Sequence, residues 1–260
     1  NKDMVEYNEL PEIDKWAIMK INELVKTVTE GYDIYQFNKA YYGINSFLVH
    51  DMSTFYLDII KDRLYVEGKT SKERRAAQTA MYIILSKLVR ILAPITAFTA
   101  EEIWKYMPKT ENENTFSVML EDYPKYDEKL YNKELDDKFK KIIEIKELAS
   151  KKLEEAREEK LIGQTLEAKV TVSANKENEL YQIIENNKNL IEDVLIVSEL
   201  ELKEDSSIEK EELSVNISRA EGEKCERCWK YTKDVGIDEE NPTICKRCSE
   251  VLKKYGNLYI

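Results

Sequence analysis

Apolar residues recur every three or four positions through the first hundred residues of the chain. This spacing places side chains on one face of an α-helix, and each apolar face needs a partner to cover it. The stripes predict a helix over residues 11–30, which Gly31 stops, and a longer helix over residues 37–59. A third stripe covers residues 81–92 and ends near Pro94, whose ring cannot continue a helix. Helices of this kind predict a bundle.

The bundle is predicted to close with a fourth helix and an irregular connector. Thr99 and Glu102 have the spacing of a capping box, so we expect the fourth helix to open there. Residues 108–132 mix polar residues and aromatics without a period, which predicts a connector on the surface. We therefore assign residues 1–132 to an antiparallel helix bundle with its connector.

A charged helix and a change of period mark the second half of the chain. Residues 133–163 carry a narrow apolar stripe, which predicts a long connecting helix that Gly163 ends. The apolar period then changes to two, which predicts a strand, followed by a helix and two more strands, one of them over residues 194–202. We assign residues 164–218 to a small α/β domain and residues 219–260 to a C-terminal module.

The composition fits a helix-rich protein with more than one core. Charged residues make up 35% of the 260 residues and hydrophobic ones 42%, with 7 Gly and 5 Pro. No apolar run approaches the roughly 18 residues that a membrane span needs, and no signal segment opens the chain. We therefore expect a cytoplasmic protein without a membrane partner. Because the first residue is Asn1 rather than Met, we interpret the chain as a piece of a longer protein.

Two Cys-x-x-Cys pairs near the end of the chain predict a metal site. Cys225 and Cys228 form the first pair, Cys245 and Cys248 form the second, and 16 residues separate them. Each pair turns two thiolates toward one point, so the spacing predicts one structural zinc ion with no open coordination position. An iron site with the same ligands, a redox dithiol and four free thiols are the alternatives. The module has few core residues, so metal binding must supply much of its folding energy.

The charge limits how the protein could meet nucleic acid. A net charge of −11 argues against indiscriminate coating of nucleic acid, because phosphate contacts need Lys and Arg side chains. A shaped RNA site with a local basic face is compatible with this charge. The candidate RNA contacts are Lys61, Arg63, Lys69, Arg74, Arg75, Arg227, Trp229, Lys230, Lys246 and Arg247.

Several of these candidates have a structural interpretation as well. Trp229 can pack against the zinc loops as a small core or stack on a base. The basic cluster after Lys69 can be a solvated helix start. His50 is the only histidine, and we expect a partly buried side chain rather than an acid or base. Tyr41 and Tyr42 are expected at the core or its edge.

Three segments resemble one family. The segment FYLDIIKDRLY at residues 55–65 resembles the signature of the class I anticodon-binding helix bundle, and LAPITAFTAEEIW at residues 92–104 resembles a later segment of it. These two segments would also fit the related valyl- and leucyl-tRNA synthetases. The segments KCERCW at residues 224–229 and ICKRC at residues 244–248 resemble the zinc module of bacterial-type isoleucyl-tRNA synthetases.

The resemblance covers essentially the whole chain and implies a function. It implies a mainly α fold with a smaller α/β junction domain and a zinc module, which together grip the anticodon arm of isoleucine tRNA. The HIGH and KMSKS motifs of the family, which bind ATP, are missing, so ATP would bind only in a separate catalytic domain. We expect this chain to be monomeric and to make no aminoacyl adenylate. A stand-alone zinc-dependent protein-interaction or RNA-binding module and an iron electron carrier are the rival hypotheses.

Overall fold

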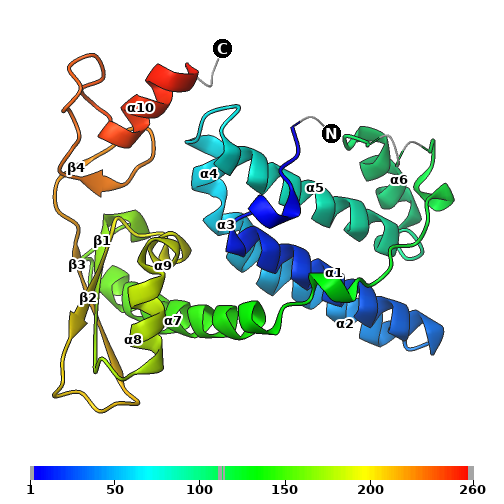
Figure 1. Cartoon of the computed structure of the whole chain (residues 1–260), viewed down its shortest axis with the longest axis horizontal. Helices are drawn as coiled ribbons and strands as arrows, with labels where there is room; N and C mark the ends of the chain where they lie inside the picture. Colours follow the sequence, from blue (N-terminus) through cyan, green and yellow to red (C-terminus); the bar gives the residue numbers. More distant parts are fainter. Residues whose placement is uncertain (1–2, 111–112, 114, 257–260) are drawn as a thin grey trace. The chain divides into compact units, whose positions relative to one another are not determined.

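The computed structural model describes residues 3–110, 113 and 115–256, and it is mainly helical with a small sheet, as predicted (Figure 1). It divides into two compact units, Asn1–Leu135 and Asp136–Ile260. The finer division of the second unit into a helix, an α/β domain and a zinc module stays a prediction.

The first unit is a helix bundle in which α1 packs against both α2 and α5. Its largest fully buried side chains include Trp16, Tyr56 and Trp104. The elements before the connector are η1 (Tyr7–Glu9), α1 (Glu12–Asp33), α2 (Phe37–Ser46), the π-helical η2 (Phe47–Tyr56), α3 (Leu57–Ile59), α4 (Lys61–Tyr65), α5 (Lys72–Leu92) and α6 (Ala97–Tyr106).

Three predicted helix ends in the bundle were wrong. Helix α1 runs through Gly31, where a Cβ atom would lie 3.1 Å from the carbonyl oxygen of Gln36, so this glycine allows close approach of the following chain. Thr99 lies inside α6 rather than at its start, so the capping box does not form. Helix α5 begins before its apolar stripe, because the Ser71 hydroxyl caps it by accepting from the Arg74 amide.

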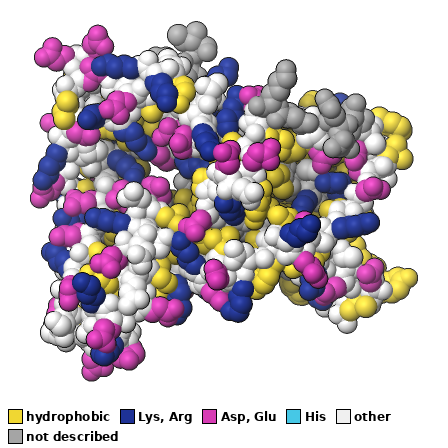
Figure 2. Space-filling model, viewed as in Figure 1, with side chains coloured by type: hydrophobic (Ala, Val, Ile, Leu, Met, Phe, Trp, Pro, Cys, Tyr) yellow, Lys and Arg dark blue, Asp and Glu magenta, His cyan; other side chains and the backbone are white. Residues whose placement is uncertain are grey.

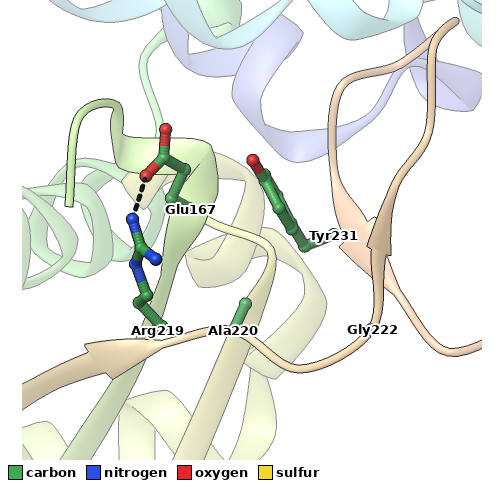
Figure 3. Close-up of a pocket in the computed structure, with 5 residues that line it drawn as sticks. All are labelled: Glu167, Arg219, Ala220, Gly222 and Tyr231. Carbon is green, nitrogen blue, oxygen red and sulfur yellow. Dashed lines mark ion pairs between the residues drawn. The ribbon is translucent and has the colours of Figure 1, made fainter.

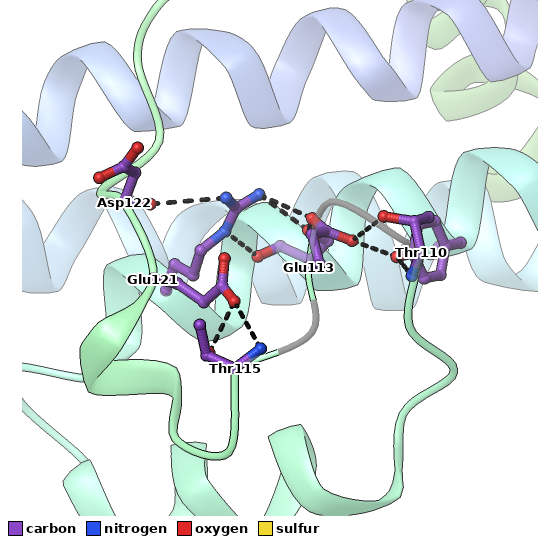
Figure 4. Close-up of polar contacts among 8 residues, drawn as sticks. Thr110, Glu113, Thr115, Glu121 and Asp122 are labelled. Carbon is purple, nitrogen blue, oxygen red and sulfur yellow. Dashed lines mark hydrogen bonds and ion pairs between the residues drawn. The ribbon is translucent and has the colours of Figure 1, made fainter.

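The connector after α6 is fixed to the bundle by a polar network around Glu113 (Figure 4). The Glu113 carboxylate accepts hydrogen bonds from the hydroxyls of Tyr82 and Ser86 on α5. It also accepts one from Thr110 at 3.3 Å and forms an ion pair with Arg90 at 3.2 Å. The predicted connector is therefore held by specific bonds although its sequence has no period.

The connector also contributes to the core. Val118, in the short helix η3 (Val118–Leu120), is buried in one cluster with Trp104. The Trp104 indole donates to the carbonyl of Thr115 at 3.1 Å, and the Thr115 hydroxyl donates to Glu121 at 2.6 Å. The expectation of a connector lying only on the surface was wrong at this point. A further short helix, η4 (Glu128–Leu130), ends the connector.

The second unit contains a three-stranded sheet with the order β2-β1-β3. The buried positions of β1 alternate over Ala168, Val170, Val172 and Ala174, as the period of two predicted. Strand β1 pairs in parallel with β2 and antiparallel with β3. The elements are α7 (Lys133–Glu158), η5 (Thr165–Glu167), β1 (Ala168–Ala174), α8 (Glu179–Asn186), α9 (Lys188–Leu195), β2 (Glu199–Glu204) and β3 (Leu213–Arg219).

Two predicted boundaries in this unit were wrong. Helix α7 ends at Glu158, and Lys160 rather than Gly163 takes the left-handed conformation that follows it. The start of the apolar run 194–202 belongs to α9, whose C-cap Ile196 has a φ of 55°. Short apolar runs fit a buried helix as well as a strand, so periodicity alone could not separate them.

The chain ends in a small module made of a hairpin and a helix. Strands β4 (Glu223–Lys224) and β5 (Tyr231–Thr232) pair antiparallel, and α10 (Lys246–Tyr255) follows. The bonds that join this module to the α/β part of its unit include one from the Tyr231 amide to the Ser198 hydroxyl at 2.7 Å and an ion pair between Lys230 and Glu192 at 3.0 Å. Among the described residues, no helix has the length and apolar character needed to cross a membrane.

The network around Glu113 gives a stability prediction. Arg90→Ala leaves a mostly buried carboxylate without its cation, so the free energy of unfolding of the first unit should fall by about 3 kcal/mol. Lys39→Ala is the control, because it breaks an exposed ion pair with Glu30 that should contribute about 0–1 kcal/mol. Urea denaturation followed by circular dichroism measures both, and equal losses would contradict the network's role.

Candidate metal centre and nucleic-acid interface

The four cysteines form one buried cluster in the second unit. Their sulfur atoms all lie within 4.8 Å of one another. The sulfur atoms of Cys228 and Cys245 are 3.8 Å apart. Four thiolates at about 2.3 Å from a zinc ion form a tetrahedron whose edges are about 3.8 Å, so this separation fits zinc.

Each pair of cysteines is held by local backbone bonds. The Trp229 amide donates to the carbonyl of Cys225 at 2.9 Å, and the Cys225 amide donates to that of Lys230 at 2.9 Å, which closes the first turn. Cys245 is the N-cap of α10, and its amide donates to the Cys225 sulfur at 3.3 Å. The hairpin and the helix therefore present the two pairs to one point.

Hydrogen bonds among the thiols shift their pKa values in opposite directions. The pKa of Cys228 is lowered because its sulfur accepts hydrogen bonds from Cys245 and Cys248. The bond to Cys228 raises the pKa of Cys245 to about 12 and also raises that of Cys248. A divalent ion would replace these protons, and four Cys ligands leave it no open position. The donor set thus fits one structural zinc ion.

Trp229 lies beside the metal site and is 55% exposed. Its backbone has a φ of 65°, a conformation that is unusual for a residue other than glycine and that the turn between the two strands imposes. The Lys224 ammonium lies 5.6 Å from the centre of the indole ring. Of the two interpretations of Trp229, the exposure favours a surface ring over a core one.

The other candidate contacts in the module differ in their availability. Lys246 is exposed and pairs weakly with Glu250 at 3.9 Å. Lys230 instead forms an ion pair with Glu192 on α9, and this pair partly neutralises its charge. The terminal nitrogens of Arg227 are buried, and within the described part of the chain they have no hydrogen-bond partner. Arg247 is half-buried on α10.

The five candidates in the bundle lie around α4 and the start of α5. Lys69 is exposed on the loop between these helices, and Lys61 is exposed but pairs with Asp58 at 2.7 Å. Arg63, by contrast, binds the buried Asp14 at 2.6 Å. Arg75 pairs with Asp3 at 3.6 Å, and Arg74 is half-buried. Their contact with RNA stays a prediction, and Lys69 is the best placed for it.

The structure reveals an aromatic surface that sequence reasoning missed. Tyr35, Phe37, Tyr41 and Tyr42, which we call the α1–α2 patch, are all more than half exposed. The rings of Tyr35 and Phe37 are 6.2 Å apart, and those of Tyr41 and Tyr42 are 5.4 Å apart. The expectation that Tyr41 and Tyr42 lie at the core or its edge was wrong. An apolar stripe wider than one helix face must expose some of its residues. His50 is exposed too, contrary to expectation.

On the face in view and in one cavity, positive and negative side chains lie near one another. Figure 2 shows Lys and Arg side chains interspersed with Asp and Glu on the face in view. A cavity of about 200 Å³ lies where β3 leads into the zinc module, lined by Glu167, Arg219 and Tyr231 (Figure 3). Its arginine already pairs with Glu167 at 3.6 Å and donates to the Leu161 carbonyl at 3.0 Å. The charged side chains of this cavity are thus paired with each other.

Two family models and many known proteins match the sequence of this chain. The family model described as the anticodon-binding domain of tRNA ligase matches residues 14–172, and the zinc finger found in FPG and IleRS matches residues 222–251. The chain belongs to the family of anticodon-binding domains of tRNA ligases. It is 46% identical over 99% of its length to the isoleucine–tRNA ligase of Kosmotoga olearia, and 44% identical over 98% to that of Caldanaerobacter subterraneus subsp. tengcongensis. In both comparisons it spans 28% of the relative's length.

The metal centre gives a prediction of composition and stability. Purified protein should contain one zinc per chain, and Cys228→Ser should lose the metal and unfold residues after about 218, because the module has few core residues of its own. The helix bundle should remain folded. Elemental analysis and thermal melts followed by circular dichroism measure these outcomes. Less than half an equivalent of zinc, iron in its place, or loss of the bundle together with the module would contradict the prediction.

Proposed function

We propose that this chain is the anticodon-arm-binding region of an isoleucine–tRNA ligase and that its partner is isoleucine tRNA. The observation that carries the proposal is the presence of an anticodon-binding domain and this zinc finger in one chain that resembles isoleucine–tRNA ligases along its whole length. Attachment of isoleucine to tRNA with ATP would belong to parts of the protein outside this chain. We further propose that the region acts as a monomer in the cytoplasm.

The surface chemistry supports RNA rather than a general polyanion as the partner. Unpaired loop bases stack on aromatic rings, and both Trp229 and the α1–α2 patch offer exposed rings. Exposed cations such as Lys69 and Lys246 can meet phosphates at a few points only. With a net charge of −11, recognition must then depend on base contacts and shape more than on charge.

A titration at low salt tests the proposal. The chain should bind an anticodon stem-loop of isoleucine tRNA more tightly than one with a scrambled loop, and the affinity should fall only moderately as salt rises, because few phosphates are contacted. Fluorescence anisotropy of labelled stem-loops measures both properties. Equal affinity for the two loops would favour the protein-interaction alternative.

Trp229 provides a test within the zinc module. Because the ring is exposed, Trp229→Ala should weaken stem-loop binding by about 1–3 kcal/mol, the usual contribution of one stacked base. Trp229→Phe, which keeps a flat ring, should retain most of the affinity. Zinc content and melting temperature should stay unchanged in both variants. If the module loses zinc in the alanine variant, the ring is structural and the stacking role is wrong.

The α1–α2 patch provides a second test in the bundle. Tyr35→Ala removes a ring that is 81% exposed, so it should leave the fold intact and weaken binding to the matched loop by about 1 kcal/mol. Phe98→Ala removes a ring that is 95% exposed on α6 and serves as the control. If the two variants change the affinity equally, the α1–α2 patch does not contact the RNA.

A further inference from the structure

Arg63 takes part in a buried cluster that joins three helical segments. Its guanidinium donates to both carboxylate oxygens of Asp14 on α1, at 2.9 and 2.6 Å. The Tyr56 hydroxyl at the end of η2 donates to the same carboxylate at 2.8 Å. Asp14 has no exposed surface, and the Arg63 side chain is 17% exposed. The three groups therefore satisfy one another inside the bundle.

The same guanidinium also reaches the first turn of α5. Its Nε and Nη2 atoms donate to the carbonyl oxygen of Glu73 at 3.2 and 2.8 Å. Arg63 thus bridges α4 to α1 and to α5 at once. Helix α4 spans only five residues and has no side-chain cap, and so short a helix is not stable on its own.

These bonds fix both ends of the loop that carries Lys69. The loop runs from Val66, which is buried, to Ser71, which caps α5. Arg63 lies before the loop and its acceptor Glu73 lies after it, so the Arg63 side chain links the two ends of the loop. Lys69 is exposed between these points. Its ammonium can meet a phosphate at a defined place only if the loop is held.

We propose that Arg63 is a positioning residue: held by Asp14, it fixes the α4–α5 loop so that Lys69 meets an RNA phosphate, and it does not contact the RNA itself. This inference rests on the proposed function. It revises the role of Arg63, whose charge suggested an RNA contact, and it assigns a role in RNA affinity to Asp14, which cannot touch RNA at all.

Asp14→Asn distinguishes a positioning role from a simple charge effect, because the two predict opposite changes in RNA affinity. Removing a negative charge should strengthen binding to a polyanion or leave it unchanged, and it would release Arg63 toward phosphate. The positioning role predicts instead that Asp14→Asn weakens binding of the anticodon stem-loop by about tenfold. Lys69→Ala should weaken it to a similar degree and lower the salt slope by about one. The double variant should bind no more weakly than Lys69→Ala alone, because both changes remove the same contact.

Two further variants control for stability. Glu113→Gln also removes a carboxylate paired with an arginine in this unit, but far along α5 from the loop, so it should destabilise the bundle without weakening binding. Tyr56→Phe removes one bond to Asp14 and replaces Asp14→Asn if that variant does not fold. It should weaken binding in the same direction but less.

The outcomes distinguish this inference from the proposed function. If the unaltered chain does not prefer the matched loop, the proposed function fails. If it does, and Lys69→Ala weakens binding while Asp14→Asn and Tyr56→Phe do not, the positioning role is wrong. Additive losses in the double variant, or an equal loss in Glu113→Gln, would also overturn it.

Discussion

Four buried sulfur atoms lie within 4.8 Å of one another at the end of this chain, and such a cluster of thiolates is stable only around a cation. The constraint shapes the whole module. The hairpin and α10 have little apolar contact of their own, so the metal supplies what a core would supply elsewhere. It also fixes Trp229 on the outside of the turn, since the backbone there must fold back to bring Cys225 and Cys228 together.

In the bundle, buried ion pairs rather than a metal hold segments that have little apolar contact of their own. Asp14 with Arg63 holds α4 and its loop, and Glu113 with Arg90 holds the connector. Both pairs join a regular helix to a segment too short or too irregular to pack by itself. Each pair fixes the position of the segment that it joins.

Local signals in the sequence predicted much of this structure. The cysteine spacing predicted the metal cluster, and the period of two predicted β1, because both depend on residues close together in the chain. Long-range pairing could not be predicted in this way. Arg63 and Asp14 are 49 positions apart, so charge alone suggested an RNA contact for Arg63. Tyr41 fitted a helical stripe, yet the stripe does not say which part of a wide face remains uncovered.

We propose that surfaces on the bundle and on the zinc module each contact the anticodon arm. Hydrogen exchange of backbone amides, with and without isoleucine tRNA, tests this claim directly. The account predicts slower exchange in the α1–α2 patch, the α4–α5 loop and the turn at Trp229, and no such change with a tRNA whose anticodon loop is scrambled. Identical protection by both RNAs, or protection confined to other segments, would contradict it.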